Sequence, residues 1–367
     1  MSAMPEESGM WRLARSERFS EYAPAWDALN EASARSPLLH SEYVAPLLTH
    51  FGEGGERIAI LETSGTARCA AIIARANPFA WNSFQPSQAP IGMWLQRDGA
   101  EGLPSHSVFA ALAARCGPSV ALLGLKQLDP EHVARPPDDR SDDACVTADY
   151  IRTARISIEG SFDDYWAGRG KNLRANMKKQ RNKLEGEGVT LRLDCITEAS
   201  DVAGAIADFG RLETAGWKAS GGTAVDAGNA QGRFYRAVFE NFSARGAARI
   251  YRYFYGDHLV AMDLCIAHGG VLVILKTAFD EGIKGSSPAF LMRHEYLPAI
   301  FSNRTFARVE FYGRVMDWHT KWSDEIRTLY HATLYRWRFA QRLDTMRRER
   351  RRGTAQENLA ATGKAEA

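Results

Sequence analysis

The second half of the sequence holds the residues whose types are best suited to chemistry. Asp280, Glu310 and Asp317 follow or lie within strand-like segments, and a carboxylate so placed can accept a proton from an attacking group. Lys276 is unusual because it stands inside an apolar run, where a cation is destabilising unless an acid or a bound anion matches it. Acids at strand ends are often solvated or paired with bases such as Arg314, so each carboxylate also has a structural interpretation.

Two basic segments could bind anions. KNLRANMKKQRNK at 171–183 predicts a basic amphipathic helix, which could hold a phosphorylated acceptor, a donor carried on tRNA or an anionic membrane face. Arg174 and Lys178 are its candidate anion-binding residues, and a solvated charged face is the alternative. RWRFAQRLDTMRRERRR at 336–352 could contact nucleic acid or lipid head groups nonspecifically. It lacks interleaved recognition residues, so we interpret it as solvated surface and expect no specific nucleic-acid partner.

Length and composition indicate a globular protein of two domains. The chain has 367 residues, more than a single hydrophobic core usually organises, and its hydrophobic and charged fractions are 45% and 25%. A formal net charge of +2 is too small to mark the whole chain as a nucleic-acid binder. No apolar run, 271–275 included, is long enough to cross a bilayer, and the first residues lack the apolar stretch of a signal peptide. We therefore expect a cytoplasmic protein without a membrane span.

The spacing of cysteine and histidine argues against metal and disulfide chemistry. The five cysteines are widely spaced, with no C-x-x-C pair. The histidines near the candidate residues, among them His294 and His319, do not show the i, i+4 spacing of a helical metal pair. We expect reduced thiols and no metal site.

The pattern of apolar and turn-forming residues divides the chain. Residues 1–128 predict a mixed α/β domain, and 129–150 are acidic and Pro-rich, as in a linker or surface loop. Residues 151–342 predict a second domain, and 343–367 are interpreted as the end of a basic helix with a disordered tail. Within 151–342 the predicted order is a strand, two helices, three antiparallel strands, a helix starting at Pro288 and two further strands.

This order and four motifs resemble one known family. LRANMKKQRNKLEGEG, GWKASGG, KTAFDEGIKGSSPAFLM and FYGRVMDWHTKW occur in that order, and together they resemble the BioF-like acetyltransferases of the GNAT superfamily, which are linked to cellulose and exopolysaccharide synthesis. That family is related to the Fem-type transferases, which pair two GNAT-like units. The resemblance implies an α+β, GNAT-type acyl-CoA N-acyltransferase fold over 151–342, with residues 1–128 as a degenerate GNAT-like partner.

The resemblance also implies an activity. It is acyl transfer, without a metal or permanently bound cofactor, from acyl-CoA, and acetyl-CoA in particular, to an amine or hydroxyl. The acceptor could be a small molecule, a sugar or a polysaccharide precursor. Two alternatives stay open: a Fem-like transferase that uses aminoacyl-tRNA, and an inactive GNAT fold that serves as an interaction module.

In a GNAT-like site the strand at 271–279 would splay from the strand at 307–313, and the donor arm would pair with the freed backbone. The donor pyrophosphate would then lie against the loop KGSSPA and the start of the next helix. The residues expected there are Lys284, Gly285, Ser286, Ser287, Pro288 and Ala289. The loop lacks the Q/R-x-x-G-x-G/A pattern of many acetyl-CoA users, so an ordinary helix start is the alternative.

The remaining roles also follow from the resemblance. Asp280, Glu310 or Asp317 would take the proton of the acceptor, and Tyr312 would protonate the leaving thiolate unless it only packs in the core. The residues expected to bind the acceptor or another substrate group are Lys276, Arg174, Lys178 and Trp217, the last from the GWKASGG motif.

Overall fold

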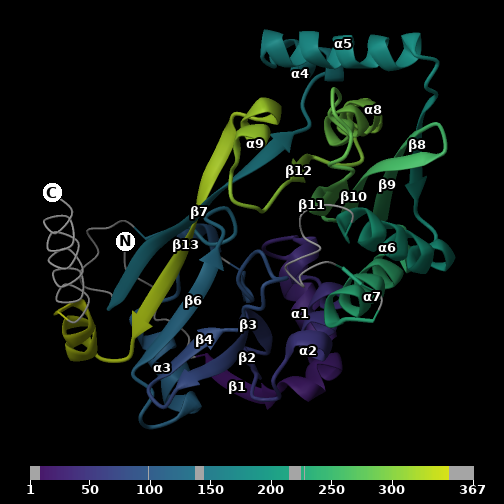
Figure 1. The fold of residues 1–367 in the computed structure, drawn as a ribbon. Helices are drawn as coiled ribbons and strands as arrows, with labels where there is room; N and C mark the ends of the chain where they lie inside the picture. The colour runs from purple at the N-terminus through teal and green to yellow at the C-terminus, as the bar shows by residue number, and fades with distance from the viewer. Residues whose placement is uncertain (1–8, 98, 137–143, 215–224, 227, 347–367) are drawn as a thin grey trace, which may run out of the picture.

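The structure is a computed structural model that describes residues 9–97, 99–136, 144–214, 225–226 and 228–346. Figure 1 shows two units joined by long central strands, with helices on both faces of a twisted sheet. No helix in the described parts of the chain combines the length and apolar character needed to cross a membrane.

The N-terminal unit contains a half-buried first strand, two helices, a meander of strands and a further helix and strand. Its strands are β1 (Met10–Arg15), β2 (Arg57–Thr63), β3 (Thr66–Asn77), β4 (Ala80–Ser83), β5 (Trp94–Gln96) and β6 (Leu122–Leu128). Its helices are α1 (Phe19–Glu31), α2 (Ser41–Phe51) and α3 (His106–Cys116), with short 3-10 turns at Ser16–Arg18, Pro37–Leu39 and Gly99–Glu101.

The C-terminal unit has the same kinds of elements and two additional helices near its start. Its strands are β7 (Cys145–Ser157), β8 (Leu191–Ile196), β9 (Ala248–Tyr255), β10 (His258–His268), β11 (Val271–Phe279), β12 (Arg308–Glu310) and β13 (Glu325–Tyr335). Its helices are α4 (Phe162–Ala167), α5 (Lys171–Gly186), α6 (Ala199–Thr214), α7 (Ala230–Ala244), α8 (Pro288–Asn303) and α9 (Asp317–Trp322). The chain is again helical over residues 338–346.

All these strands belong to one sheet, whose order is nearly symmetrical. Along it the strands run β1-β2-β3-β4-β6-β13-β7-β12-β11-β10-β9-β8, and β5 pairs with β3 beside this path. The N-terminal unit therefore runs from β1 to β6, and the C-terminal unit runs in the opposite direction from β12 to β8. In each unit a strand, two helices, three antiparallel strands, a helix and a parallel strand follow one another.

The two units exchange their last strands at the centre of the sheet. β7 follows β6 in sequence but pairs with β12, and β13 follows β12 but pairs with β6. β7 and β13 also pair with each other in antiparallel register from Glu325↔Arg155 to Leu334↔Cys145. Each unit therefore depends on a strand that follows the other, so the two form one folding body.

The core lies on both faces of this sheet. One apolar cluster joins the units, because Trp26 of α1 and Leu47 of α2 share it with Phe209 of α6 and Phe239 of α7. On the opposite face of the C-terminal strands, α8 and α5 pack through a second cluster that includes Met292. A third cluster lies beneath α3. Figure 1 shows α5 stacked outside α8 and remote from α1 and α2.

The predicted linker at 129–150 is wrong in its second half. β7 begins at Cys145, so the expected boundary at residue 150 falls inside a strand. The burial pattern of β7 shows little apolar alternation before residue 153, and backbone pairing with β13 holds this polar segment in the sheet. Asp129, at the other end of the segment, is buried at 2% exposure. The helix expected at the start of 343–367 is present to residue 346, and the remaining residues of that range lie outside the described chain.

Candidate active site

The C-terminal unit contains a cleft where two parallel strands separate. β11 and β12 pair at only three positions, Val271↔Arg308, Leu272↔Val309 and Val273↔Glu310. Beyond these positions the strands diverge and leave a cleft of about 800 Å³. Its walls include Ile274 and Phe279 on β11 and Phe311 just after β12. An extended, mostly uncharged ligand arm fits between such walls and can use the backbone groups that the separation leaves free.

A β-bulge marks the point of separation. In the pairing of β10 with β11, Cys265 lies opposite Ile274 and Leu264 lies opposite Lys276, so Leu275 is an extra residue. An extra residue bends its strand and turns its peptide groups away from the regular ladder. The bulge follows the last β11·β12 pair by two residues. It therefore presents backbone groups at the apex of the cleft, where a ligand carbonyl would be polarised.

The start of α8 forms the outer end of the cleft. Lys284, Ser286, Ser287, Pro288 and Ala289 all line it, as the sequence predicted for the donor loop, and the structure thus brings these residues together. Pro288 occupies the first turn of α8, where its missing N–H costs no helical hydrogen bond. A helix N-terminus of this kind favours negative charge.

The neighbours of this loop fix its shape. Gly285 adopts φ +89°, a left-handed conformation that a side chain would strain. Ser286 Oγ lies 3.0 Å from Tyr255 OH, and the Ser287 N–H donates to Gln180 Oε1 at 2.8 Å. Gln180 comes from α5 and is buried at 8% exposure. Sequence reasoning missed Gln180, because nothing in the sequence of a basic helix indicates which polar residue will cap a distant one.

A buried ion pair forms the inner wall. Arg293 of α8 donates to both carboxylate oxygens of Asp263 at 3.0 Å, and Tyr296 OH donates to the same carboxylate at 2.9 Å. Arg293 also lies 4.7 Å from the ring centre of Trp318 and donates to Thr277 Oγ1 at 2.6 Å. Arg293 and Asp263 are almost fully buried, so each charge depends on the other. The pair joins β10, β11 and α8 around the cleft.

His319 also lines the cleft and is held as a neutral ring. Its Nδ1 accepts the backbone N–H of Met316 at 2.9 Å, which leaves the proton on Nε2. Burial, helped by the charge of Arg293, lowers the pKa of His319 to about 4. A neutral imidazole N–H can donate a hydrogen bond to a ligand, and we count His319 among the site residues that the sequence had left without a role.

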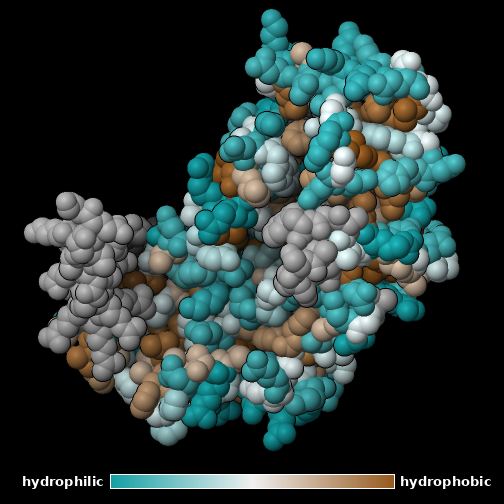
Figure 2. Space-filling view, in the orientation of Figure 1, coloured by the Kyte–Doolittle hydropathy of each residue, from teal (hydrophilic) through white to brown (hydrophobic). Residues whose placement is uncertain are grey.

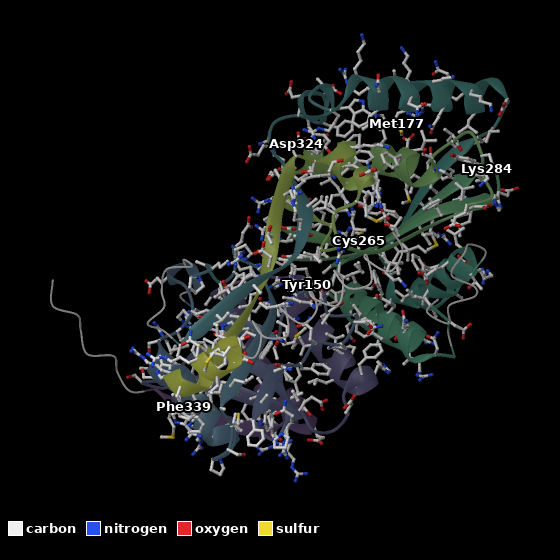
Figure 3. All side chains as sticks on the ribbon, turned by 60° about the vertical axis from the view of Figure 1, so that its left-hand side comes forward. Tyr150, Met177, Cys265, Lys284, Asp324 and Phe339 are labelled. Atoms are coloured by element: carbon white, nitrogen blue, oxygen red, sulfur yellow. The ribbon has the colours of Figure 1, made fainter. Side chains whose placement is uncertain are left out.

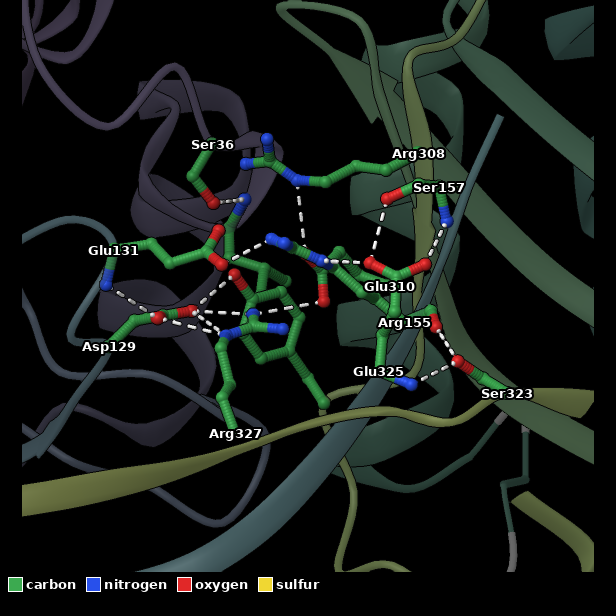
Figure 4. Close-up of polar contacts among 12 residues, drawn as sticks. Ser36, Asp129, Glu131, Arg155, Ser157, Arg308, Glu310, Ser323, Glu325 and Arg327 are labelled. Atoms are coloured by element: carbon green, nitrogen blue, oxygen red, sulfur yellow. Dashed lines mark hydrogen bonds and ion pairs between the residues drawn. The ribbon is translucent and has the colours of Figure 1, made fainter. Parts of the chain in front are cut away.

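Glu310 pairs with Val273, at the last position that joins β11 to β12, and belongs to a network between the units (Figure 4). It is fully buried, and Arg327 of β13 donates to it at 2.9 Å and to Asp129 at 2.6 Å. Burial raises the pKa of Glu310 to about 7, against the attraction of Arg327. Burial also opposes ionisation of Asp129, but His132 and Arg327 outweigh it and hold the pKa of Asp129 well below its usual value. The two carboxyls therefore differ sharply in proton affinity.

The structure places Tyr312 away from the cleft. Its hydroxyl donates to Asp129 Oδ2 at 3.0 Å, and Arg327 lies 5.2 Å from its ring centre. Burial raises the pKa of Tyr312 well above its usual value, which makes it a poor proton donor. Its φ of +37° is unusual for a residue other than glycine, so the network holds it in a strained backbone conformation. These contacts favour packing over the expected protonation of a thiolate.

The two other candidate carboxylates lie at the rim. Asp280 accepts from Gly282 N–H at 2.8 Å and lies 2.8 Å from His258 Nε2, and these contacts, led by His258, lower its pKa. Asp317 is the exposed first residue of α9, between the cleft residues Met316 and Trp318. Of the described residues that line the cleft, neither is one. Glu310 does not line the cleft either, so the lining by itself favours none of the three carboxylates.

Lys276 lines the cleft and is matched by an acid that the sequence did not single out. Its Nζ lies 2.9 Å from Glu213 Oε1, and the rings of Phe209 and Tyr235 lie 5.7 and 5.4 Å from it. Glu213 is buried at the end of α6 and also accepts the Val225 N–H at 2.8 Å. This pairing explains how a lysine is tolerated in an apolar strand. Trp217, the fourth expected substrate residue, lies outside the described residues.

Arg174 and Lys178 lie apart from this cleft. They line a separate groove of about 820 Å³ between α4, α5 and α8, together with Trp166 and His294. Figure 3 shows Met177 directed inward from α5, toward α8, while Lys284 lies at the outer edge of the same unit. The structure therefore does not bring the two basic residues together with Lys276. Among the described residues, no group of three or more metal-ligating side chains could hold an ion.

The equivalent place in the N-terminal unit is closed. β4 and β6 also pair in parallel at three positions, from Ala80↔Leu122 to Asn82↔Gly124. The chain after β4 then fills the gap: Gly92 N–H donates to Gln127 O at 2.9 Å, and a Cβ on Gly92 would lie 2.0 Å from Lys126 O. Ile91 and Met93 are buried on either side of Gly92. This unit keeps the topology but closes the gap between its parallel strands, and its own hollow of about 820 Å³ lies instead between β2, β3 and the start of α3.

Comparisons with known proteins agree with this geometry. Residues 171–320 match the model of a family described as an acetyltransferase (GNAT) domain. The chain has the GNAT fold. The predicted α+β fold with a GNAT-like N-terminal partner is thereby confirmed. No curated protein matches the sequence significantly.

Solved structures with the same fold span nearly the whole chain. FemX is 9% identical, with a TM-score of 0.56 over 84% of this chain and 95% of its own. A conserved protein of unknown function from Bacteroides thetaiotaomicron VPI-5482 is 11% identical, with a TM-score of 0.55 over 88% of this chain and 99% of its own. The C-terminal domain of a protein described as a putative lysylphosphatidylglycerol synthetase from Agrobacterium fabrum is 12% identical, with a TM-score of 0.52 over 89% of this chain and 95% of its own. At these identities the similarity concerns the fold alone.

Proposed function

We propose that the protein transfers an acyl group from a pantetheine thioester, such as acetyl-CoA, to an amine or hydroxyl acceptor. The observation that carries the proposal is the separation of β11 from β12 at a β-bulge, which leaves a cleft that ends at the N-terminus of α8. The match of residues 171–320 to an acetyltransferase domain supports the same reaction. Lys284 and the residues 285–289 are the proposed donor-binding loop.

The chain's own residues would divide the chemistry in the following way. Backbone groups at Leu275 polarise the thioester carbonyl, and the His319 Nε2–H is available to a polar atom of the donor arm. Glu310 is the proposed base, because it pairs with β11 at the last position before the strands separate, and a carboxyl with a pKa near 7 can take a proton from the acceptor at neutral pH. Lys276, fixed by Glu213, is the proposed contact for a polar group of the acceptor.

The motif resemblance extends the proposal to the acceptor and the compartment. We infer a sugar or polysaccharide precursor as acceptor, because the four motifs resemble the BioF-like family. A cytoplasmic location is supported by the wide spacing of the five cysteines, with no C-x-x-C pair, as expected of thiols in a reducing compartment.

The first experiment is titration of the protein with acetyl-CoA by calorimetry, which needs no acceptor. Lys284→Glu places a carboxylate beside the donor loop and should weaken binding about tenfold, which is roughly 1.4 kcal/mol. Lys321→Glu is the matched control, because Lys321 is exposed on α9 and is not among the described residues that line the cleft. Absence of measurable binding by the unaltered protein would overturn the proposal.

A further inference from the structure

A basic surface lies beside the donor cleft and has no part in the chemistry described so far. The outward face of α5 carries the exposed side chains of Lys171, Lys178 and Lys179, and the only carboxylate of the helix is Glu185. Figure 2, in the orientation of Figure 1, shows hydrophilic residues covering the region of α4 and α5. Such a row of cations attracts an anionic partner.

This basic face is attached to the mouth of the cleft. Gln180, on the inner side of α5, accepts the hydrogen bond from Ser287 of the donor loop. Lys183 follows on the side of α5 that faces this loop, and its Nζ lies 3.5 Å from the position that a Cβ on Gly285 would occupy. An ion pair between Arg181 and Glu295 also fastens α5 to α8. A partner bound on α5 would therefore sit directly over the opening through which a donor arm enters.

The size and chemistry of this region suit a protein better than a free nucleotide. A helix of 16 residues is about 24 Å long, more than the nucleotide end of CoA can cover. Two apolar side chains at the cleft mouth, Phe279 and Met316, are 42% and 60% exposed. An apolar centre bordered by charged residues is the usual anatomy of a protein interface.

The backbone of the donor loop also favours a donor carried on a protein. A diphosphate at a helix N-terminus uses several free backbone N–H groups. Here the Ser287 N–H is already bonded to Gln180, and Pro288 has none. The loop therefore suits a single phosphate, as in a phosphopantetheine arm joined to a protein, better than the diphosphate of CoA.

We propose that the physiological donor is an acidic carrier protein that docks on α5 and inserts an acylated phosphopantetheine arm into the cleft. The proposal rests on the acyl transfer proposed above. The acceptor nitrogen or oxygen attacks the thioester carbonyl, a C–N or C–O bond forms and the C–S bond breaks. The proton of the acceptor passes to Glu310, and the sulfur leaves as the thiolate of the arm, which is protonated to the free thiol on release.

The test compares two donors that share the same arm. Acetylated acyl carrier protein and acetyl-CoA are titrated against the full chain by calorimetry at low and moderate salt. We expect the carrier to bind at least tenfold more tightly than acetyl-CoA, and its affinity to fall as salt rises. Equal affinity for both donors, or tighter binding of acetyl-CoA, would overturn the proposal.

Charge reversal locates the docking surface. Lys171→Glu with Lys179→Glu should weaken binding of the acetylated carrier by more than tenfold and change acetyl-CoA binding by less than twofold. Arg75→Glu with Arg115→Glu is the matched control, because both arginines are exposed on the N-terminal unit. If the α5 variant weakens both donors equally, or neither, the carrier does not dock there.

The remaining outcomes separate this inference from its alternatives. If transfer RNA binds the α5 face more tightly than the carrier does, and competes with it, the partner is a nucleic acid and the proposal is wrong. If acetyl-CoA binds but the carrier does not, the proposed acyl transfer stands and only the carrier fails. If neither thioester binds, the proposed function itself fails.

Discussion

The two units of this protein share one topology but differ in what happens after their parallel strands separate. In each, a parallel pair is held at three positions, β4 with β6 and β11 with β12. In the N-terminal unit the following chain folds back, and Gly92 fills the gap against β6. In the C-terminal unit β11 continues past a bulge and the gap stays open as a cleft.

This difference shows that topology alone does not make a binding site. An open cleft leaves backbone groups without partners and side chains without neighbours, so other interactions must hold its walls apart. The C-terminal unit provides them through the buried pair Arg293 and Asp263 and through the hydrogen bond between Gln180 and Ser287. The N-terminal unit fills the same place with buried apolar residues such as Ile91, and serves as a partner that completes the sheet.

The largest expected effect comes from breaking the buried pair that holds the cleft open. Arg293→Met leaves the Asp263 carboxylate buried without its cation, and we expect the free energy of unfolding to fall by about 3–5 kcal/mol. Urea unfolding followed by fluorescence measures this loss. Arg236→Met on α7 removes an exposed pair with Glu240 and should cost less than about 1 kcal/mol. Equal losses in the two variants would show that the buried pair does not hold the cleft.

The second prediction concerns the proton chemistry that distinguishes the open cleft. Glu310→Gln should reduce release of free thiol from acetyl-CoA, measured with a panel of amino sugars as acceptors, about 100-fold. In the unaltered protein the rate should rise with pH through about 7, because the base must lose its proton. The variant should show no such rise. A pH profile that is unchanged in the variant would remove Glu310 from the mechanism.

The same substitution has a stability signature. The folded state raises the pKa of Glu310 from 4.5 to about 7, so it binds the proton more tightly than the unfolded state does. The stability that this group contributes is present below pH 4.5 and is lost as the pH rises to about 7. Urea unfolding between these values should therefore show a flatter pH dependence in Glu310→Gln. An unchanged dependence would mean that Glu310 titrates normally.

A third prediction compares the same substitution at the start of a helix in each of the two units. Ser286→Trp places a large ring at the open cleft and should weaken acetyl-CoA binding by about 30-fold, or roughly 2 kcal/mol. Ser107→Trp makes the same change in the first turn of α3, at the separate hollow of the N-terminal unit, and should leave binding unchanged. Calorimetry on both variants provides the comparison. If Ser107→Trp weakens binding as much, the donor does not use the C-terminal cleft.

The smallest effect is expected from the contact that joins α5 to the donor loop. Gln180→Ala leaves the Ser287 N–H without its partner and should lower the free energy of unfolding by about 1 kcal/mol. Amide hydrogen exchange should also become faster at Ser287. Protection that is unchanged at this amide would show that another group satisfies it.

The order of the C-terminal elements could be predicted because each depends on local pattern. Pro288 starts a helix, the alternation of apolar residues marks β8, and turns at 256 and 269 separate the strands of the meander. The loop that the motifs predicted to bind the donor lines the cleft, and its role as a donor loop stays a prediction. These signals lie within a few residues of the structure they specify, so one sequence is enough to show them.

What only the tertiary structure decided are the contacts between residues that are distant in sequence. The polar start of β7 forms a strand because β13 pairs with it, Glu213 matches Lys276, and Gln180 caps α8. The pKa of Glu310 depends on its burial beside Arg327 and Asp129. These three residues come from three different segments of the chain. The sequence by itself determined a GNAT fold and which loop precedes its helix at Pro288. Tertiary packing decided which of the two parallel strand pairs opens into a cleft, because that depends on which distant side chains fill or support the gap.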